Sequence, residues 1–215
     1  DALAVLAEAQ RLYATDPGRV YLTGHSMGGH GAWMVGGLDP GRFGAIGPSA
    51  GWISFVSYKV RTPVGAETPL GRMIMRAFLP SDPYAVIRNY LQQGVYLLHG
   101  EKDDDVPVTE ARDMAAALGR GHRDFIYHEQ PGAGHWWDDS PEAGTACVDW
   151  SAMFDFFARH ARPEPERVRD VEFATPCPGV TAVSNWLTIE AQLRPLELSS
   201  ARLHSSPADG LFSGT

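Results

Sequence analysis

Apolar and polar positions recur along this chain with two different periods. Residues 3–13 carry apolar side chains at helical spacing with Glu8 and Arg11 on the opposite face, which predicts a core-facing helix. Shorter apolar runs have the length and the β-branched and aromatic content of buried strands. These runs occupy residues 19–23, 45–49, 95–99 and 124–128.

Helical spacing returns between and after these runs, at residues 31–38, 111–118 and 147–161. Strands that alternate with helices predict βαβ units, so the expected fold class is α/β, with a mostly parallel sheet flanked by helices. Residues 53–80 contain Pro63, Pro69 and Pro80 and show no clear period. We expect that segment to be an irregular insertion or a lid above the sheet.

The pattern of apolar and polar residues changes after residues 163–166, which read Pro-Glu-Pro-Glu and are typical of a linker. Beyond it, short β-like runs are separated by turn residues. We therefore divide the chain into an α/β catalytic domain at 1–162 and a linker with the start of a small β-rich domain at 163–215. Too few aromatic residues follow the linker to decide whether that second unit binds carbohydrate or protein.

Composition narrows the classes of function. Lys and Arg number 18 against 26 Asp and Glu, and this net charge of −8 without a basic patch argues against nucleic acid as a partner. No apolar run approaches the roughly 20 residues of a membrane-spanning helix, so no membrane partner is expected. The two cysteines, Cys147 and Cys177, fit no metal-binding spacing. The pattern does not specify the oligomeric state.

A candidate nucleophile follows the first predicted strand. Residues 24–28 read Gly-His-Ser-Met-Gly, which has the form G-x-S-x-G, and a predicted helix comes next. In that context the serine sits on a strained strand-to-helix turn, and glycines on both sides remove Cβ atoms that would collide. Ser26 is thus the candidate nucleophile, with the backbone N–H of Met27 as one oxyanion-hole donor. A phosphate-binding loop is disfavoured because no lysine follows.

Candidates for the acid and the base lie after two later strands. Residues 103–105 are three adjacent aspartates, and chemistry alone leaves the choice among them open. His135 follows Gly132 and Gly134 in a loop that can carry it inward, and histidine is the usual general base. The other seven histidines are expected to be structural. The order serine, aspartate, histidine is that of α/β-hydrolases, and this mechanism needs no metal and no organic cofactor.

Three stretches together resemble the prolyl oligopeptidase (S9-like) and esterase branch of the α/β-hydrolase superfamily. They are Gly-His-Ser-Met-Gly-Gly at 24–29, His-Gly-Glu-Lys-Asp at 99–103 with Val-Pro at 106–107, and Gly-Ala-Gly-His at 132–135. The resemblance covers about residues 1–160, selects Asp103 as the acid, and implies a large exported bacterial hydrolase, periplasmic or secreted, of which this chain is a fragment. The implied substrate is a small ester or peptide.

Two departures from that family matter. Oligopeptidases often carry Tyr after the nucleophile where this chain has Met27, which favours an esterase. The strands that precede the first helix in the family, and that carry the second oxyanion-hole donor, are missing from this chain. Loss of one such donor typically costs about 10²–10³ in rate. We therefore expect the full-length parent to be active and this piece to be weak, inactive or poorly folded.

Three tryptophans are candidates for substrate contact, namely Trp52, Trp136 and Trp137. They either form a binding wall for an aromatic or sugar-bearing group or pack a lid against the sheet. Three functions stay open. The first is an S9-type serine hydrolase acting on an ester or peptide bond. The second is a carboxylesterase of carbohydrate or plant-polymer esters, and the third is a catalytically dead hydrolase fold that serves as a binding module.

Overall fold

A computed structural model describes residues 2–58, 65, 67–139, 141, 145–208 and 210–215. The elements in chain order are α1 (Ala2–Leu12), β1 (Tyr21–His25), α2 (Met27–Leu38), β2 (Ala45–Ser49), α3 (Phe55–Tyr58), α4 (Pro69–Phe78), η1 (Leu79–Ser81), η2 (Ile87–Gln92), β3 (Gly94–Gly100), α5 (Thr109–Leu118), β4 (Phe125–Gln130), α6 (Ala146–Asp149), α7 (Ser151–Ala158), η3 (Pro165–Arg167), β5 (Asp170–Thr175), β6 (Val183–Ser184), β7 (Leu187–Thr188), β8 (Ser199–Ser206) and β9 (Leu211–Gly214).

The first sheet contains four strands in the order β1-β2-β3-β4, and every neighbouring pair is parallel. All residues of β2 and of β3 are buried. Continuous apolar runs of this kind are typical of parallel strands that are covered on both faces. The prediction of an α/β fold with a mostly parallel sheet is confirmed.

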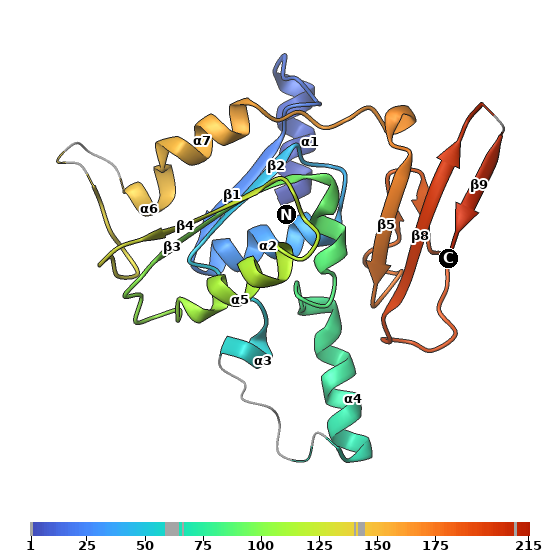
Figure 1. Ribbon diagram of the computed structural model, residues 1–215, viewed down its shortest axis with the longest axis horizontal. Coiled ribbons are helices and arrows are strands. Elements are labelled where there is room, and N and C mark those ends of the chain that lie inside the picture. Colours follow the sequence, from blue (N-terminus) through green and yellow to red (C-terminus); the bar gives the residue numbers. More distant parts are fainter. Residues whose placement is uncertain (1, 59–64, 66, 140, 142–144, 209) are drawn as a thin grey trace.

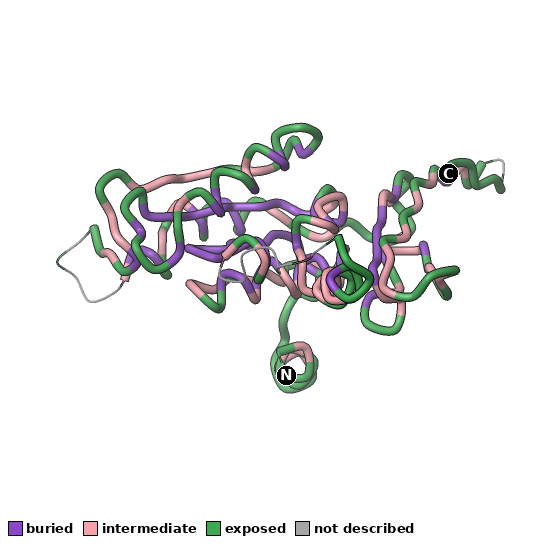
Figure 2. The backbone as a smooth tube through the Cα atoms, turned by 90° about the horizontal axis from the view of Figure 1, so that it is seen from below, coloured by how far each residue is buried: buried purple, intermediate pink, exposed green. Residues whose placement is uncertain are grey.

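Helices cover both faces of this sheet (Figure 1). One face packs against α2, α5 and η2, with Trp33, Met114 and Tyr90 fully buried beside Val95 and Leu97. The other face packs against α7 through Met153, Phe156 and Phe157. Figure 2 shows the buried backbone running through the middle of the body, with exposed backbone outside it. The parallel strands therefore end at fixed positions in a rigid layer.

Helix α1 forms where the apolar spacing predicts it, but its expected role as a core-facing helix is wrong. It has no buried residue, and Val5 is 68% exposed. Leu3 alone in α1 packs against the core as a half-buried side chain. Figure 2 shows α1, next to the N label, beside the body. Amphipathic spacing identifies an apolar face but does not identify what covers it.

The segment 53–80 is more regular than expected, because α4 is a ten-residue helix. Thr68 is its N-cap and accepts a hydrogen bond from the Gly71 N–H at 3.0 Å, and Pro69 occupies the first helical turn. Proline is well tolerated there since that N–H has no helical partner. The expectation of an irregular segment is therefore wrong for residues 69–78. Residues 59–64 and 66 of the segment lie outside the described residues.

The single helix predicted at 147–161 is divided into α6 and α7. Trp150 separates them with an extended backbone, at φ −53° and ψ 110°. Its indole N–H donates to the Tyr96 hydroxyl at 2.9 Å. Trp150 is thus held against Tyr96 of β3 at the point where the helix is interrupted. The apolar spacing alone does not indicate this interruption.

A β-rich region follows the parallel sheet. Strands β5, β8 and β9 form an antiparallel sheet, and β6 pairs with β7. Asn89 of η2 joins this region to the body, since its fully buried side chain accepts from the Ala174 N–H and donates to the Ala174 carbonyl, both at 2.8 Å. The same amide donates to the Gly37 carbonyl at 2.9 Å. One side chain therefore links η2, β5 and α2.

Candidate active site

Ser26 lies on the sharp turn between β1 and α2. Its backbone has φ 59° and ψ −116°, a conformation that is strained for a residue with a Cβ. The Ser26 N–H donates to the Ser49 carbonyl at the end of β2, at 2.9 Å. This bond fixes the turn against the neighbouring strand, so the hydroxyl projects from the carboxyl edge of the sheet.

The glycines that this turn requires differ in part from those expected. A Cβ on Gly24 would clash with the Gly28 carbonyl, and a Cβ on Gly29 would clash with the Ser49 carbonyl. A Cβ on Gly28 would meet no atom within 4 Å. Glycine is therefore required by the local packing at positions 24 and 29. The expectation from the G-x-S-x-G pattern is right for Gly24 and wrong for Gly28.

The acid and base loops lie side by side beyond β3 and β4. The Lys102 N–H donates to the Ala133 carbonyl at 2.7 Å, and the Glu101 N–H donates to the Gln130 carbonyl at 2.9 Å. A Cβ on Gly100 would clash with the carbonyls of Ala133 and Gly134. The close contact of the two loops thus depends on glycine at position 100, and it brings Asp103 near His135.

The structure brings Ser26, Asp103 and His135 together as a hydrogen-bonded chain. His135 Nδ1 lies 2.7 Å from Asp103 Oδ2, and His135 Nε2 lies 2.9 Å from Ser26 Oγ. Asp103 and His135 are buried, whereas Asp104 and Asp105 are exposed. Of the three adjacent aspartates, only Asp103 reaches the histidine.

The state of Asp103 determines the tautomer of His135. Burial raises the pKa of the Asp103 carboxyl, but hydrogen bonds from His99, His135 and the Val106 N–H outweigh it and lower this pKa to about 2. An ionised carboxylate only accepts hydrogen bonds, so His135 Nδ1 carries the proton. Nε2 of the neutral ring then has a free lone pair that accepts the Ser26 hydroxyl proton. The arrangement can abstract a proton from Ser26.

His99 contacts the hydrogen-bonded chain at Asp103, although the sequence predicts a structural role for this histidine. Its fully buried Nε2 lies 3.2 Å from Asp103 Oδ2 and 2.9 Å from the Val106 carbonyl. Asp103 Oδ1 accepts the N–H groups of Asp105 and Val106 at 3.0 and 2.8 Å. The signal in the sequence was the position of His99 near the end of β3, four residues before Asp103, which lies in the loop that turns back on this strand.

His25 is the second histidine that the sequence reasoning undervalued. Its Nδ1 lies 3.0 Å from Ser49 Oγ, which in turn donates to the Cys147 carbonyl at 2.6 Å. Its ring centroid is 4.8 Å from that of His135. Burial, followed by the unfavourable interaction between two protonated rings at His25 and His135, lowers the pKa of His25 to about 4, so the His25 ring is neutral near pH 7. A neutral imidazole therefore packs against the candidate base.

The three candidate tryptophans lie in different surroundings. Trp52 is only 8% exposed and stacks between His30 and Tyr58. Trp137 is half-buried and packs edge-on against Trp150. Trp136 is 64% exposed and contacts the rings of His25 and His135. Trp136 is therefore the most exposed of the three tryptophans, and it lies beside the candidate base His135.

Met27 begins α2, directly after Ser26, and its side chain is 76% exposed. Its backbone N–H lies at the N-terminal end of a twelve-residue helix, where the helix dipole favours a negative charge. This position is suited to an oxyanion that develops on a carbonyl attacked by Ser26. The expected oxyanion role of Met27 is therefore geometrically reasonable.

The residues that the structure describes include no group of three or more His, Cys, Asp or Glu side chains able to hold a metal ion. Within the same residues, no helix is long and apolar enough to cross a membrane.

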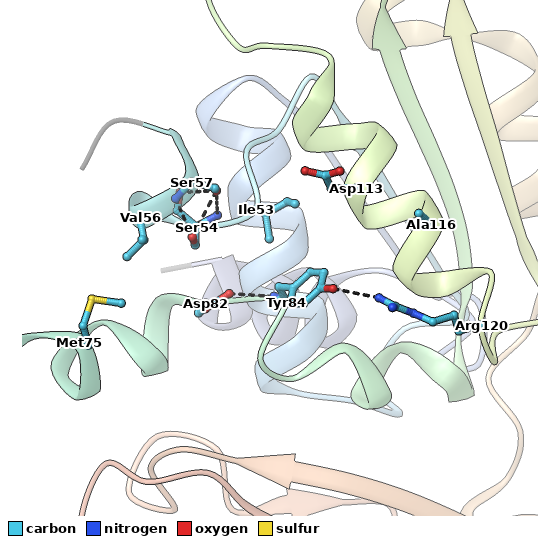
Figure 3. A pocket seen from close by; sticks show the side chains of 10 residues that line it. All are labelled: Ile53, Ser54, Val56, Ser57, Met75, Asp82, Tyr84, Asp113, Ala116 and Arg120. Carbon is cyan, nitrogen blue, oxygen red and sulfur yellow. Dashed lines mark hydrogen bonds between the residues drawn. The ribbon is translucent and has the colours of Figure 1, made fainter. Parts of the chain in front are cut away.

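A separate cavity of about 470 Å³ lies between α5, α3 and the chain around Tyr84 (Figure 3). Arg120 donates to the Tyr84 hydroxyl at 2.9 Å, and Asp82 accepts the Tyr84 N–H at 3.0 Å. The residues that line it are Ile53, Ser54, Val56, Ser57, Met75, Asp82, Tyr84, Asp113, Ala116 and Arg120. None of them belongs to the hydrogen-bonded chain of Ser26, His135 and Asp103.

Comparison with known proteins places this geometry in a family. Residues 1–164 match the model of the prolyl oligopeptidase family. An uncharacterized secreted protein of Arthroderma benhamiae is 31% identical over 117 residues, which are 54% of this chain and 13% of that protein.

Several solved structures share the fold. A thermostable esterase aligns with a TM-score of 0.52 at 18% identity, over 75% of this chain and 36% of its own. The acylaminoacyl peptidase of Pyrococcus horikoshii aligns with a TM-score of 0.58 at 16% identity, over 74% of this chain and 27% of its own. Dipeptidyl peptidase 4 of Porphyromonas gingivalis aligns with a TM-score of 0.56 at 23% identity, over 73% and 22%.

This chain thus spans about an eighth of the secreted relative and at most 36% of these structures. The family match covers the parallel sheet, its flanking helices and all the residues of the hydrogen-bonded chain. The protein belongs to the prolyl oligopeptidase family of serine hydrolases, which has the α/β-hydrolase fold.

Proposed function

We propose that this chain carries the catalytic centre of a serine hydrolase that cleaves an ester or peptide bond through an acyl-enzyme. Ser26 is the nucleophile, His135 the general base and acid, and Asp103 the residue that orients His135. The observation that supports this most directly is the hydrogen-bonded chain from Asp103 through His135 to Ser26, at 2.7 and 2.9 Å.

The proposed reaction follows from these contacts. Ser26 Oγ attacks the carbonyl carbon of the substrate while His135 Nε2 takes the hydroxyl proton, and the Met27 N–H stabilises the resulting oxyanion. The tetrahedral intermediate collapses when the bond to the leaving atom breaks and His135 returns the proton to that atom. Water then attacks the acyl-enzyme by the same route in reverse and releases the acid and Ser26. Asp103 remains ionised and stabilises the imidazolium that forms in each half.

A carboxylesterase acting on carbohydrate or plant-polymer esters is the second candidate. The exposed side chain of Met27 next to the nucleophile favours it, because the oligopeptidases that the sequence resembles often carry Tyr there. Matched substrates that share one acyl group, an aryl ester and an anilide of proline, distinguish the two. The aryl ester is intrinsically the more reactive of the two. A ratio of anilide to ester hydrolysis well above the ratio of their intrinsic reactivities would support the peptidase.

The first experiment is labelling with a fluorescent fluorophosphonate, in which Ser26 Oγ displaces fluoride from phosphorus. We expect the full-length protein to be labelled and its Ser26→Ala variant to be unlabelled, with a loss of activity of about 10⁶-fold in turnover. Ser151→Ala is a matched control, since Ser151 is exposed at the start of α7, and it should keep the label. A folded full-length protein that takes no label would favour the catalytically dead binding module.

We also propose that the full protein is exported, on the basis of the relative described as secreted. Fractionation of cells that produce the full-length protein tests this, and recovery in the cytosol alone would contradict it.

A further inference from the structure

A large aromatic side chain is exposed to solvent beside the candidate base. Trp136 directly follows the candidate base and is 64% exposed. The other two candidate tryptophans, Trp52 and Trp137, pack against aromatic rings and so cover apolar surface within the protein. An apolar surface of this size that is left uncovered next to a nucleophile is typical of a ligand contact.

Trp136 is held in place before any substrate arrives. Its ring centroid lies 4.3 Å from that of His25, and it meets His135 edge-on at 5.6 Å and 86°. His25 is in turn fixed through Ser49 to the Cys147 carbonyl, and His135 is fixed by Asp103. An aromatic surface backed by two fixed rings loses little conformational entropy when a flat group stacks on it.

The position of Trp136 relative to His135 indicates which part of the substrate it meets. In the acylation half-reaction His135 Nε2 gives its proton to the leaving atom, so that atom must lie near the His135 ring. Trp136 contacts this ring. The Met27 N–H lies on the nucleophile turn, where it is proposed to stabilise the oxyanion formed from the carbonyl oxygen. The group on the leaving atom would thus lie at the side of the site that carries the His135 ring, which Trp136 contacts.

We propose that Trp136 is a specificity-determining residue that stacks on an aromatic leaving group, so that the preferred substrates are esters or amides of aromatic alcohols or amines. This inference rests on the proposed function, because it assumes that Ser26 and His135 carry out acyl transfer. The acyl group plays no part in it.

The test compares two esters with the same acyl group, phenyl acetate and ethyl acetate. The quantity measured is the ratio of kcat/KM for phenyl acetate to that for ethyl acetate, which reports steps up to release of the leaving group and does not depend on the fraction of active protein. We expect Trp136→Ala and Trp136→Leu each to lower this ratio by about 10-fold, as an aromatic stack and its buried area contribute. Trp136→Phe should keep the ratio within about 3-fold of wild type.

Phe154→Ala is the matched control, since Phe154 is an exposed aromatic residue on α7 that contacts only Phe157 among the aromatic rings of the described structure. It should leave the ratio unchanged. An equal loss on both esters in Trp136→Ala and Trp136→Leu would overturn the inference and leave the proposed function intact. A folded full-length protein that hydrolyses neither ester and takes no fluorophosphonate label would overturn both.

Discussion

The two sheets of this molecule differ in how their strands are covered and in what they carry. In the parallel sheet every residue of β2 and β3 is buried, whereas β8 alternates between more and less exposed positions and all of β9 is exposed. The candidate active site belongs entirely to the first region, at or just beyond the carboxyl ends of β1, β3 and β4. Helices packed on both faces of the parallel sheet hold these strand ends in place, which suits a site that depends on contacts of 2.7 to 2.9 Å.

If this comparison is correct, substitutions in the two regions should fail in different ways. Changes at the ends of the parallel strands should reduce the reaction rate. Changes where the β-rich region joins the body should reduce the free energy of unfolding and leave the rate of the folded molecules as it is.

Among variants that keep Ser26, the largest effect is expected for Asp103→Asn. The asparagine amide can donate to His135 Nδ1, which favours the tautomer with the proton on Nε2 and leaves no acceptor for the Ser26 hydroxyl. We expect kcat to fall about 10⁴-fold, measured on an aryl ester at pH 8. Asp104→Asn is the control at an exposed neighbour and should retain wild-type activity. Similar losses in the two variants would remove the special role of Asp103.

Much of this site could be predicted because each part is encoded locally. The strand, the turn and the helix around Ser26 are contiguous, and the order of serine, aspartate and histidine limits the connections among them. The surroundings could not be predicted in the same way. His99 reaches Asp103 only because the loop after β3 turns back, and the exposure of Trp136 depends on loops that are distant in sequence. Helix α4 was missed because a proline at a helix start resembles a helix breaker.

The junction between the two regions should respond in stability. Asn89→Ala would leave the Gly37 carbonyl and both backbone groups of Ala174 without their partner in a fully buried position. We expect the free energy of unfolding to fall by about 3 kcal/mol. Urea denaturation measures this change, and the rate per labelled active site should stay at the wild-type value.

Asn185→Ala is the comparison for that variant, because Asn185 contacts Gln92 from a half-buried position. A smaller loss of about 1 kcal/mol is expected there. We propose that residues 1–162 and 163–215 form two units joined at Asn89. A separate unfolding transition of the β-rich region in Asn89→Ala would support that division, and a single cooperative transition would count against it.

Gly29 tests the packing of the nucleophile turn. A Cβ at this position would clash with the Ser49 carbonyl and approach the Gly51 backbone, so Gly29→Ala should destabilise the protein by about 2 kcal/mol. Gly28→Ala is a close control, since a Cβ there meets nothing within 4 Å and alanine favours a helix. It should be neutral or stabilise by up to about 1 kcal/mol. Equal thermal stability of the two variants would mean that the turn adjusts freely.

A further effect is the pH dependence of stability contributed by His25. Its pKa is lowered from 6.5 to about 4 in the folded protein, first by burial and then by the unfavourable interaction between two protonated rings at His25 and His135. The unfolded chain therefore binds a proton on His25 between these values while the folded protein does not. The stability contributed by neutral His25 is complete above pH 6.5 and is lost as the pH falls toward 4.

We expect this loss to be about 2 kcal/mol between pH 6.5 and pH 4, measured as the free energy of unfolding in urea. His25→Gln should remove that part of the pH dependence, because glutamine does not titrate. His204→Gln removes a histidine that is exposed, and it should retain the wild-type slope. His30 and His122 also have lowered pKa values through burial, but they remain in every variant and cancel in the difference. Parallel curves for wild type and His25→Gln would mean that His25 is protonated equally in the folded and unfolded states, and that a neutral imidazole is not required beside His135.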